Sequence, residues 1–140
     1  MSIFKTLTEK RRTGNFGEDA AVRYLKKKGF KILERNYVAF GHEADIIARH
    51  KDVTVFIEVK TRSTERLLKG ESRPAAAVTP KKQRSIAAAA KVFLALHRPE
   101  GRSRFDVVEV LTEGEGKSRR VSKINHIESA FTLTTAYNIH

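Results

Sequence analysis

Two apolar stretches within residues 41–62 carry charged side chains, and this pattern constrains the chain more than any other feature. Glu43 and Asp45 precede the first stretch, whereas Glu58 and Lys60 end the second. Strand side chains alternate between the two faces of a sheet, so residues two apart share a face. We therefore predict that Glu43 lies beside Asp45, and that Glu58 lies beside Lys60 opposite an apolar strand face. The gap of 13 residues from Asp45 to Glu58 predicts a tight hairpin that brings both pairs together.

Carboxylates and a lysine at the ends of apolar strands are costly to bury unless their charge is compensated. A hard divalent cation with oxygen ligands provides this compensation, and carboxylates with water suit Mg²⁺ or Mn²⁺ rather than zinc. We therefore predict a metal site at Asp45 and Glu58. Lys60 would lie beside the metal, where an ammonium group orients an attacking water or stabilises developing negative charge. Hydrolysis of a phosphodiester needs this set of groups.

Other interpretations of these residues stay open. A Glu-x-Lys pair alone is weak evidence, because such pairs abound on protein surfaces as solvated ion pairs. A buried ion-pair cluster that serves only the structure would show the same residues. Glu43 either supports or bridges the metal site, or accepts hydrogen bonds from nearby backbone, and its position favours neither role.

The charge balance of the chain favours a polyanionic partner. In 140 residues, 28 Lys and Arg against 16 Asp and Glu leave a net charge of +12. Nucleic acid is the partner we expect from this charge, although a soluble protein can also simply be basic. The chain has no cysteine, which excludes disulfides and thiolate sites. Without a secretory signal or a long apolar run, a cytoplasmic protein with no membrane contact is expected.

The order of predicted elements indicates an α/β domain with a mixed sheet flanked by helices. A flexible basic arm is expected at residues 1–13, a single domain at 14–131 and a disordered tail at 132–140. Inside the domain, the expected elements are a helix from a cap at Asn15 to Gly29, strands at 30–39, 43–48 and 53–60, an exposed loop at 63–74, a helix from a cap at Thr79 to Pro99, and strands at 104–111 and 121–127.

Each predicted helix carries charges that its own stability does not explain. On a helical wheel, Glu18 falls inside the apolar arc of the first helix, so this carboxylate needs a partner. A glutamate that only favours the helix N-terminus is the alternative. The second helix begins with Lys81, Lys82 and Arg84, which oppose the helix dipole. Contact with phosphates or a solvated basic face would each explain these cations.

Several motifs along residues 14–131 together resemble the YraN-like family of uncharacterised bacterial proteins. The motifs are Gly14-x-x-Gly17-Glu18-x-x-Ala21, Arg35-Asn36-Tyr37, Gly41-x-Glu43-x-Asp45-Ile46-Ile47-Ala48, Val55-Phe56-Ile57-Glu58-Val59-Lys60-Thr61-Arg62, Arg104-Phe105-Asp106-Val107-Val108 and His126-Ile127-Glu128-x-Ala130-Phe131. His42 departs from the pattern, because the family usually has glycine there.

The family is similar to restriction-endonuclease-like nucleases with an Asp…Glu-x-Lys core, and among them to archaeal Holliday-junction resolvases. This resemblance implies a restriction-endonuclease-like mixed central β-sheet flanked by helices. It also implies Glu18, Asp45, Glu58 and Lys60 as the active constellation, and a dimer acting on branched DNA.

We thus expect a Mg²⁺- or Mn²⁺-dependent endonuclease, with Asp45, Glu58 and Glu18 as metal ligands and Glu43 as a further candidate. The residues expected to hold nucleic acid are Thr61, Arg62, Lys81, Lys82, Gln83 and Arg84. The alternative is a non-catalytic nucleic-acid-binding protein that retains the nuclease fold, whose binding would depend on salt and not on metal.

Overall fold

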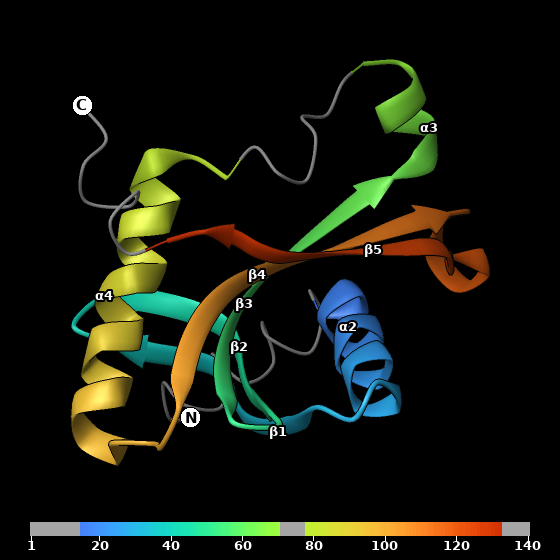
Figure 1. Ribbon diagram of the computed structural model, residues 1–140. Coiled ribbons are helices and arrows are strands. Elements are labelled where there is room, and N and C mark those ends of the chain that lie inside the picture. The colour runs from blue at the N-terminus through green and yellow to red at the C-terminus, as the bar shows by residue number, and fades with distance from the viewer. Residues whose placement is uncertain (1–14, 71–77, 133–140) are drawn as a thin grey trace, which may run out of the picture.

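The computed structural model describes residues 15–70 and 78–132, which form one mixed sheet with a long helix on each face (Figure 1). The elements in chain order are α2 (Phe16–Lys27), β1 (Lys31–Ala39), β2 (His42–His50), β3 (Val53–Ser63), α3 (Thr64–Leu68), α4 (Pro80–His97), β4 (Arg102–Glu113), the 3-10 turn η1 (Gly116–Ser118) and β5 (Arg120–Phe131). The predicted α/β fold with a mixed central sheet is confirmed. No helix within these residues has the length and apolar character needed to cross a membrane.

The five strands follow the order β1-β2-β3-β4-β5. Neighbours are antiparallel except β3 and β4, which run parallel from Val53↔Arg102 to Ser63↔Thr112. Two parallel neighbours need a crossover connection, and the segment containing α4 supplies it. As a result, the N-terminus of α4 is brought back to the end of β3, where the sequence places its charged residues.

Two apolar cores lie on opposite faces of the sheet. The core under α4 contains Ala44, Ile47, Phe56, Phe93, Phe105 and Phe131. The core under α2 contains Leu25, Ile46, Ala48, Val55, Ile57 and Val108. Every residue of β3 from Val53 to Glu58 is buried, as expected for a central strand covered on both faces. The strand face predicted to be apolar, with Val53, Val55 and Ile57, packs in the core under α2.

The predicted helices match the structure well, whereas the predicted loop at residues 63–74 is wrong in its first part. Ser63 Oγ accepts a hydrogen bond from the Arg66 backbone N–H at 3.4 Å and caps the short helix α3. Lys69 Nζ lies 2.9 Å from Glu65 Oε1 on the next turn. These local polar interactions stabilise a helix of five residues, none of them buried, which is too short for apolar periodicity to reveal it.

Smaller differences concern element ends. Thr79 caps α4 as predicted, since its Oγ1 accepts from the Lys82 N–H at 3.2 Å, but the side chain of Asn15 makes no cap hydrogen bond in α2. The last strand continues to Phe131, four residues beyond the predicted end at residue 127. The predicted arm at 1–13, the end of the predicted loop and nearly all of the predicted tail lie outside the described residues.

Gly17 allows α2 to approach the sheet closely. A Cβ atom at this position would lie 1.7 Å from Thr61 Oγ1 and 2.9 Å from Thr61 Cβ. The next residue, Glu18, belongs to the candidate site, so this contact sets how deeply its carboxylate reaches toward the sheet. Thr61, a predicted nucleic-acid contact, is exposed and lies against Gly17 of α2.

We expect Gly17→Ala to lower the free energy of unfolding by about 1–3 kcal/mol, because α2 must shift to relieve the overlap. Chemical denaturation of the single and double variants measures this effect. Adding Thr61→Gly removes all three atoms that the new Cβ would meet, so the double variant should recover part of the loss. Strictly additive effects of the two substitutions would contradict the contact.

Candidate active site

The ladder between β2 and β3 opens at Asp45. The two strands pair from His50↔Val53 to Ile46↔Ile57. Beyond this point the Val59 backbone N–H donates a 2.8 Å hydrogen bond to Asp45 Oδ2. A side-chain carboxylate thus takes the place of a strand carbonyl, which fixes Asp45 at the mouth of the opening.

The alternation of β2 side chains also breaks at this position. Ala44 and Ile47 belong to the core under α4, while Ile46 and Ala48 belong to the core under α2. Because Ala44 and Ile46 face different cores, the simple alternation that predicted Glu43 beside Asp45 does not hold here. Glu43 is half-buried and makes no hydrogen bond or ion pair with Asp45 or Glu58 among the described contacts.

Asp45 and Glu58 form a close pair of carboxylates. Burial and the charge of Glu58 raise the pKa of Asp45 to about 7, against the lowering effect of the Val59 N–H and of Lys82. The Glu58 side chain is 4 % exposed, and its Oε2 has no hydrogen-bond partner among the described residues. An acceptor buried in this way indicates a site that a cation or a donor from a ligand would complete.

Two lysines flank Glu58. Lys60 Nζ lies 3.4 Å from Glu58 Oε1, and Lys82 Nζ lies 3.8 Å from Glu58 Oε2. Lys60 comes from the same strand, as the alternation predicted. Lys82 comes from the first turn of α4, so a residue predicted only as a phosphate contact reaches the carboxylate pair itself.

Glu18 approaches the pair from α2, and its side chain is buried as the helical wheel predicted. Burial raises the pKa of Glu18, Asp45 adds to this rise, and the Arg35 guanidinium and the Asn36 amide lower it, with a net raised value. Arg35 Nε and Asn36 Nδ2 donate to the same Oε1 atom at 2.9 and 3.0 Å. The partner that this carboxylate needs is therefore supplied by β1.

Arg35 and Asn36 are site residues that the sequence reasoning did not assign. Asn36 has a φ of 51°, in the left-handed region that asparagine tolerates better than most residues. This conformation interrupts the regular strand and lets consecutive side chains reach one carboxylate. An asparagine after an arginine in a strand of mixed polarity was the available signal.

The donor set suits a hard cation bound mainly by water and substrate. Among residues 15–70 and 78–132, no three His, Asp or Glu side chains form a group that could hold a metal ion. Glu18 is engaged by Arg35 and Asn36, which leaves the Asp45–Glu58 pair. Mg²⁺ is commonly bound by one or two carboxylates, with waters and phosphate oxygens as further ligands. The residues present therefore fit Mg²⁺ or Mn²⁺ better than a metal that needs a full protein cage.

The predicted nucleic-acid contacts separate into two groups. Lys81 and Arg84 are exposed on the first turns of α4, next to Lys82. Arg62 instead lies inside the fold, with Nε 3.3 Å from Glu109 Oε2. Gln83 also points inward, since its Nε2 donates to the Val78 carbonyl at 2.9 Å, and its Oε1 is buried without a hydrogen-bond partner in the described part of the chain.

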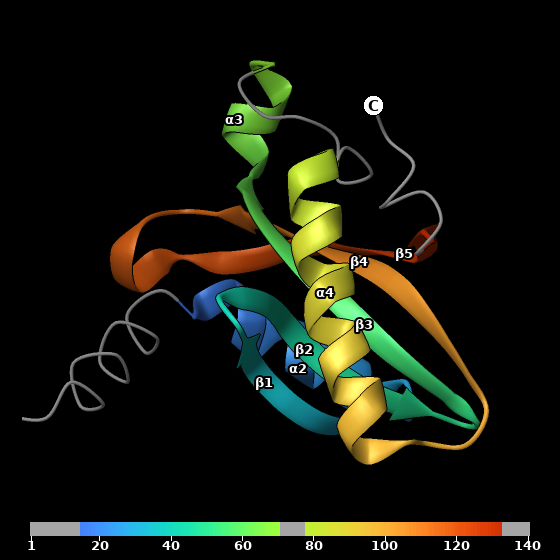
Figure 2. The same ribbon diagram turned by 90° about the vertical axis from the view of Figure 1, so that its left-hand side faces the viewer.

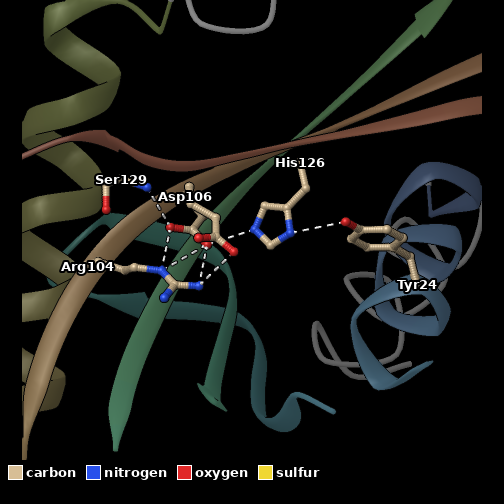
Figure 3. A network of polar contacts seen from close by, with 6 residues as sticks. Tyr24, Arg104, Asp106, His126 and Ser129 are labelled. Carbon is tan, nitrogen blue, oxygen red and sulfur yellow. Dashed lines mark hydrogen bonds and ion pairs between the residues drawn. The ribbon is translucent and has the colours of Figure 1, made fainter. Parts of the chain in front are cut away.

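A second polar network ties α2 to β4 and β5 (Figure 3). Asp106 is fully buried and accepts from His126 Nε2 at 2.7 Å, from Arg104 Nε at 3.0 Å and from the Ser129 N–H at 3.0 Å. The other ring nitrogen of His126 lies 3.3 Å from the Tyr24 hydroxyl on α2. The network thus anchors the helix that carries Glu18.

Burial alone would raise the pKa of Asp106, but the hydrogen bonds from His126, Arg104 and Ser129 lower it overall. This network is the second feature that the sequence reasoning missed. An aspartate within the apolar strand 104–111 was the signal, because a buried carboxylate requires donors.

Comparisons with known proteins agree with the motifs in the sequence. Residues 17–110 match the family described as "Uncharacterised protein family UPF0102". A UPF0102 protein of Chlorobium phaeobacteroides is 42 % identical over 120 residues, which cover 84 % of this chain and 92 % of that protein. A UPF0102 protein of Syntrophomonas wolfei is 43 % identical over 122 residues, covering 86 % and 98 %. The predicted resemblance to YraN-like uncharacterised proteins is supported, and the chain belongs to the UPF0102 family.

Proposed function

We propose that this protein is a Mg²⁺- or Mn²⁺-dependent nuclease whose active site is the Asp45–Glu58 pair. The observation that carries the proposal is that half-buried Asp45 lies close to the buried Glu58 carboxylate, so that burial and the charge of Glu58 raise the pKa of Asp45 to about 7. Two neighbouring carboxylates in a poorly hydrated place lower the stability of the fold when both are ionised. Groups with pKa values shifted in this way are concentrated at functional sites. The ammonium of Lys60, 3.4 Å from Glu58, completes the set that phosphodiester hydrolysis requires.

Asp45 and Glu58 would hold the cation, and Glu18 would lie near Asp45 as a further carboxylate of the site. When bound there, a divalent cation supplies a water of lowered pKa and neutralises charge on the phosphate. Lys60 is placed to donate a hydrogen bond to the attacking water or to a phosphate oxygen, and Lys82 approaches Glu58 from the opposite side at 3.8 Å. The ammonium groups of Lys60 and Lys82 would then be attracted by the negative charge of the bound phosphate.

The surface around the site supports a nucleic-acid substrate. Lys81 and Arg84 extend the positive charge from Lys82 along the outside of α4, and the chain as a whole carries +12. Phosphate contacts of this kind position a nucleic acid without reading its sequence. We propose DNA as the substrate, following the resemblance of the motifs to junction resolvases.

A non-catalytic nucleic-acid-binding role is the second candidate. The observation in its favour is that Lys60 and Lys82 both pair with Glu58, so that two ammonium groups balance its charge. That role predicts salt-dependent binding that is indifferent to divalent cations. Metal dependence therefore separates the two candidates.

The first test is thermal melting during titration with Mg²⁺ or Mn²⁺ at pH 8. We expect the melting temperature of the wild type to rise with metal, because binding to the folded state stabilises it. Asp45→Asn should show little or no rise. The matched control is Asp52→Asn, which removes an exposed aspartate from the turn after β2 and should behave as the wild type. A wild type that shows no rise at millimolar metal would favour the binding role.

The raised pKa of Asp45 adds a dependence on pH. The pKa of Asp45 is about 7 in the fold against a reference value of 3.8. Between pH 3.8 and pH 7 the folded protein therefore carries a proton on Asp45 that the unfolded chain has lost. The stability that this proton provides is complete below pH 3.8 and is lost as the pH rises through 7. In the absence of metal, Asp45→Asn should therefore melt at a higher temperature than the wild type at pH 8, and this advantage should vanish near pH 4.

A further inference from the structure

Phe40 occupies a turn position that does not suit it. It forms the tip of the β1–β2 hairpin together with Gly41, with φ values of 50° and 78°. A hairpin turn with two positive φ values favours asparagine or glycine at its first position, because a bulky side chain is strained there. The Phe40 side chain is nevertheless 88 % exposed to solvent.

No contact within the described part of the fold offsets the strained backbone of Phe40 or the exposure of its ring. A single exposed apolar residue is ordinary on a protein surface, but an exposed aromatic ring in a left-handed turn combines a hydration cost with backbone strain. Asparagine would remove both costs and keep the turn. The exposed Phe40 ring can therefore contact a binding partner, and it does not contribute to the core.

The hairpin tip lies beside the basic start of α4. His42, two residues after Phe40, approaches Ser85 on α4, with Nδ1 3.3 Å from Oγ. Ser85 is one helical turn beyond Lys81 and Lys82. Figure 2 shows the turn between β1 and β2 next to α4, with β3 passing behind that helix toward α3.

The strand that follows Phe40, β2, contains Asp45 of the carboxylate pair. Asp45 follows Phe40 by five residues, so the two residues lie at most roughly 16–18 Å apart. A span of this size covers only a few nucleotides of a single strand. A chain of phosphates that crosses Lys82 could therefore present a base to Phe40 while another phosphate lies at Asp45 and Glu58.

We propose that Phe40 stacks on an unpaired base of the nucleic acid, an inference that rests on the proposed function and narrows its substrate class. Aromatic rings bind unpaired bases in a sequence-tolerant way, since every base has a π-face. In a closed duplex no unpaired base is available to this ring. The preferred substrate is thus a single-stranded segment or a strand with unpaired bases near the cleaved phosphate.

Phe40→Trp gives a direct readout, because the chain contains no tryptophan. Its fluorescence would be followed on addition of a single-stranded DNA oligonucleotide, and separately of a relaxed, covalently closed DNA duplex, in EDTA so that metal-dependent cleavage does not occur. We expect quenching by the single strand and little change with the duplex. Equal quenching by both, or by neither, would overturn the proposal.

Phe40→Ala provides the second measurement. We expect its affinity for the single strand to fall about 5- to 100-fold, with unchanged affinity for the closed duplex and an unchanged melting temperature. Val38→Ala is the matched control, because Val38 lies on the same hairpin and is 53 % exposed. Its affinities should equal those of the wild type.

The outcomes separate this inference from the proposed function. An equal loss of affinity for both DNA forms, or no loss, would overturn the stacking role while metal-dependent cleavage could persist. A change in oligomeric state without a change in DNA binding would instead assign Phe40 to contact with a second copy, and would also overturn it. Conversely, base stacking by a protein that fails to cleave would remove the nuclease proposal alone.

Discussion

Lys60→Met is expected to lower metal-dependent cleavage of DNA by at least about 100-fold. Removing one preorganised donor from a developing negative charge typically costs 10²–10³ in rate. Methionine is unbranched and only one atom shorter than lysine, and the Lys60 side chain is 32 % exposed, so the fold should tolerate the change. Cleavage of single-stranded and branched DNA by purified protein, at matched metal concentrations, measures the effect.

Lys69→Met is the control for this experiment. Lys69 also pairs with a glutamate, at 2.9 Å from Glu65 of α3, but the side chains of both residues are largely exposed. Its cleavage rate should equal that of the wild type. If Lys60→Met and Asp45→Asn cleave as fast as the wild type, the assignment of the active site fails. If Lys60→Met only makes the protein more stable, the purely structural ion-pair reading gains support.

Local patterns predicted those parts of the site that depend on one element. The place of Glu58 and Lys60 on one face follows from strand alternation, and their ion pair confirms it. The burial of Glu18 follows from its place on the helical wheel. In each case the periodicity of the element alone decides which way the side chain points.

Features that arise where elements meet could not be predicted in this way. The opening of the ladder at Asp45 breaks the alternation that would have placed Glu43 with the pair. The contact of Lys82 with Glu58 needs the crossover that returns α4 to the end of β3, a tertiary feature with no local signal. Arg35 and Asn36 reach Glu18 because Asn36 adopts a left-handed conformation, which periodicity does not encode.

The polar network of Asp106 shows the same limit on a larger scale. Its donors come from β4, from His126 in β5 and from the backbone of Ser129, whose φ of 51° interrupts β5. The sequence can state that a buried aspartate needs donors, but only the sheet order identifies them. With His126 Nε2 donating to Asp106, a neutral ring can accept from the Tyr24 hydroxyl, so the whole chain of groups is satisfied.

Asp106→Asn is therefore expected to lower the free energy of unfolding by about 3–5 kcal/mol, which corresponds to a loss of roughly 10–20 °C in melting temperature. The substitution removes the nearer of the two carboxylates that pair with Arg104, at 3.0 Å against 3.6 Å for Glu128, and sets an amide NH₂ among donors. Glu65→Gln is the control, since it removes an exposed carboxylate from an ion pair and should cost less than about 1 kcal/mol.

The pH dependence of this variant should oppose that of Asp45→Asn. The pKa of Asp106 is lowered in the fold, so its contribution to stability is present above the unfolded value of 3.8 and is lost as the pH falls through the lower folded value. The deficit of Asp106→Asn should accordingly be largest near neutral pH and shrink in acid. Tyr24 links this network to α2, the helix that carries Glu18. We therefore also expect a smaller metal-induced rise in melting temperature in the variant than in the wild type. A variant with full metal response and an undiminished acid deficit would show that Asp106 neither positions α2 nor acts through its charge.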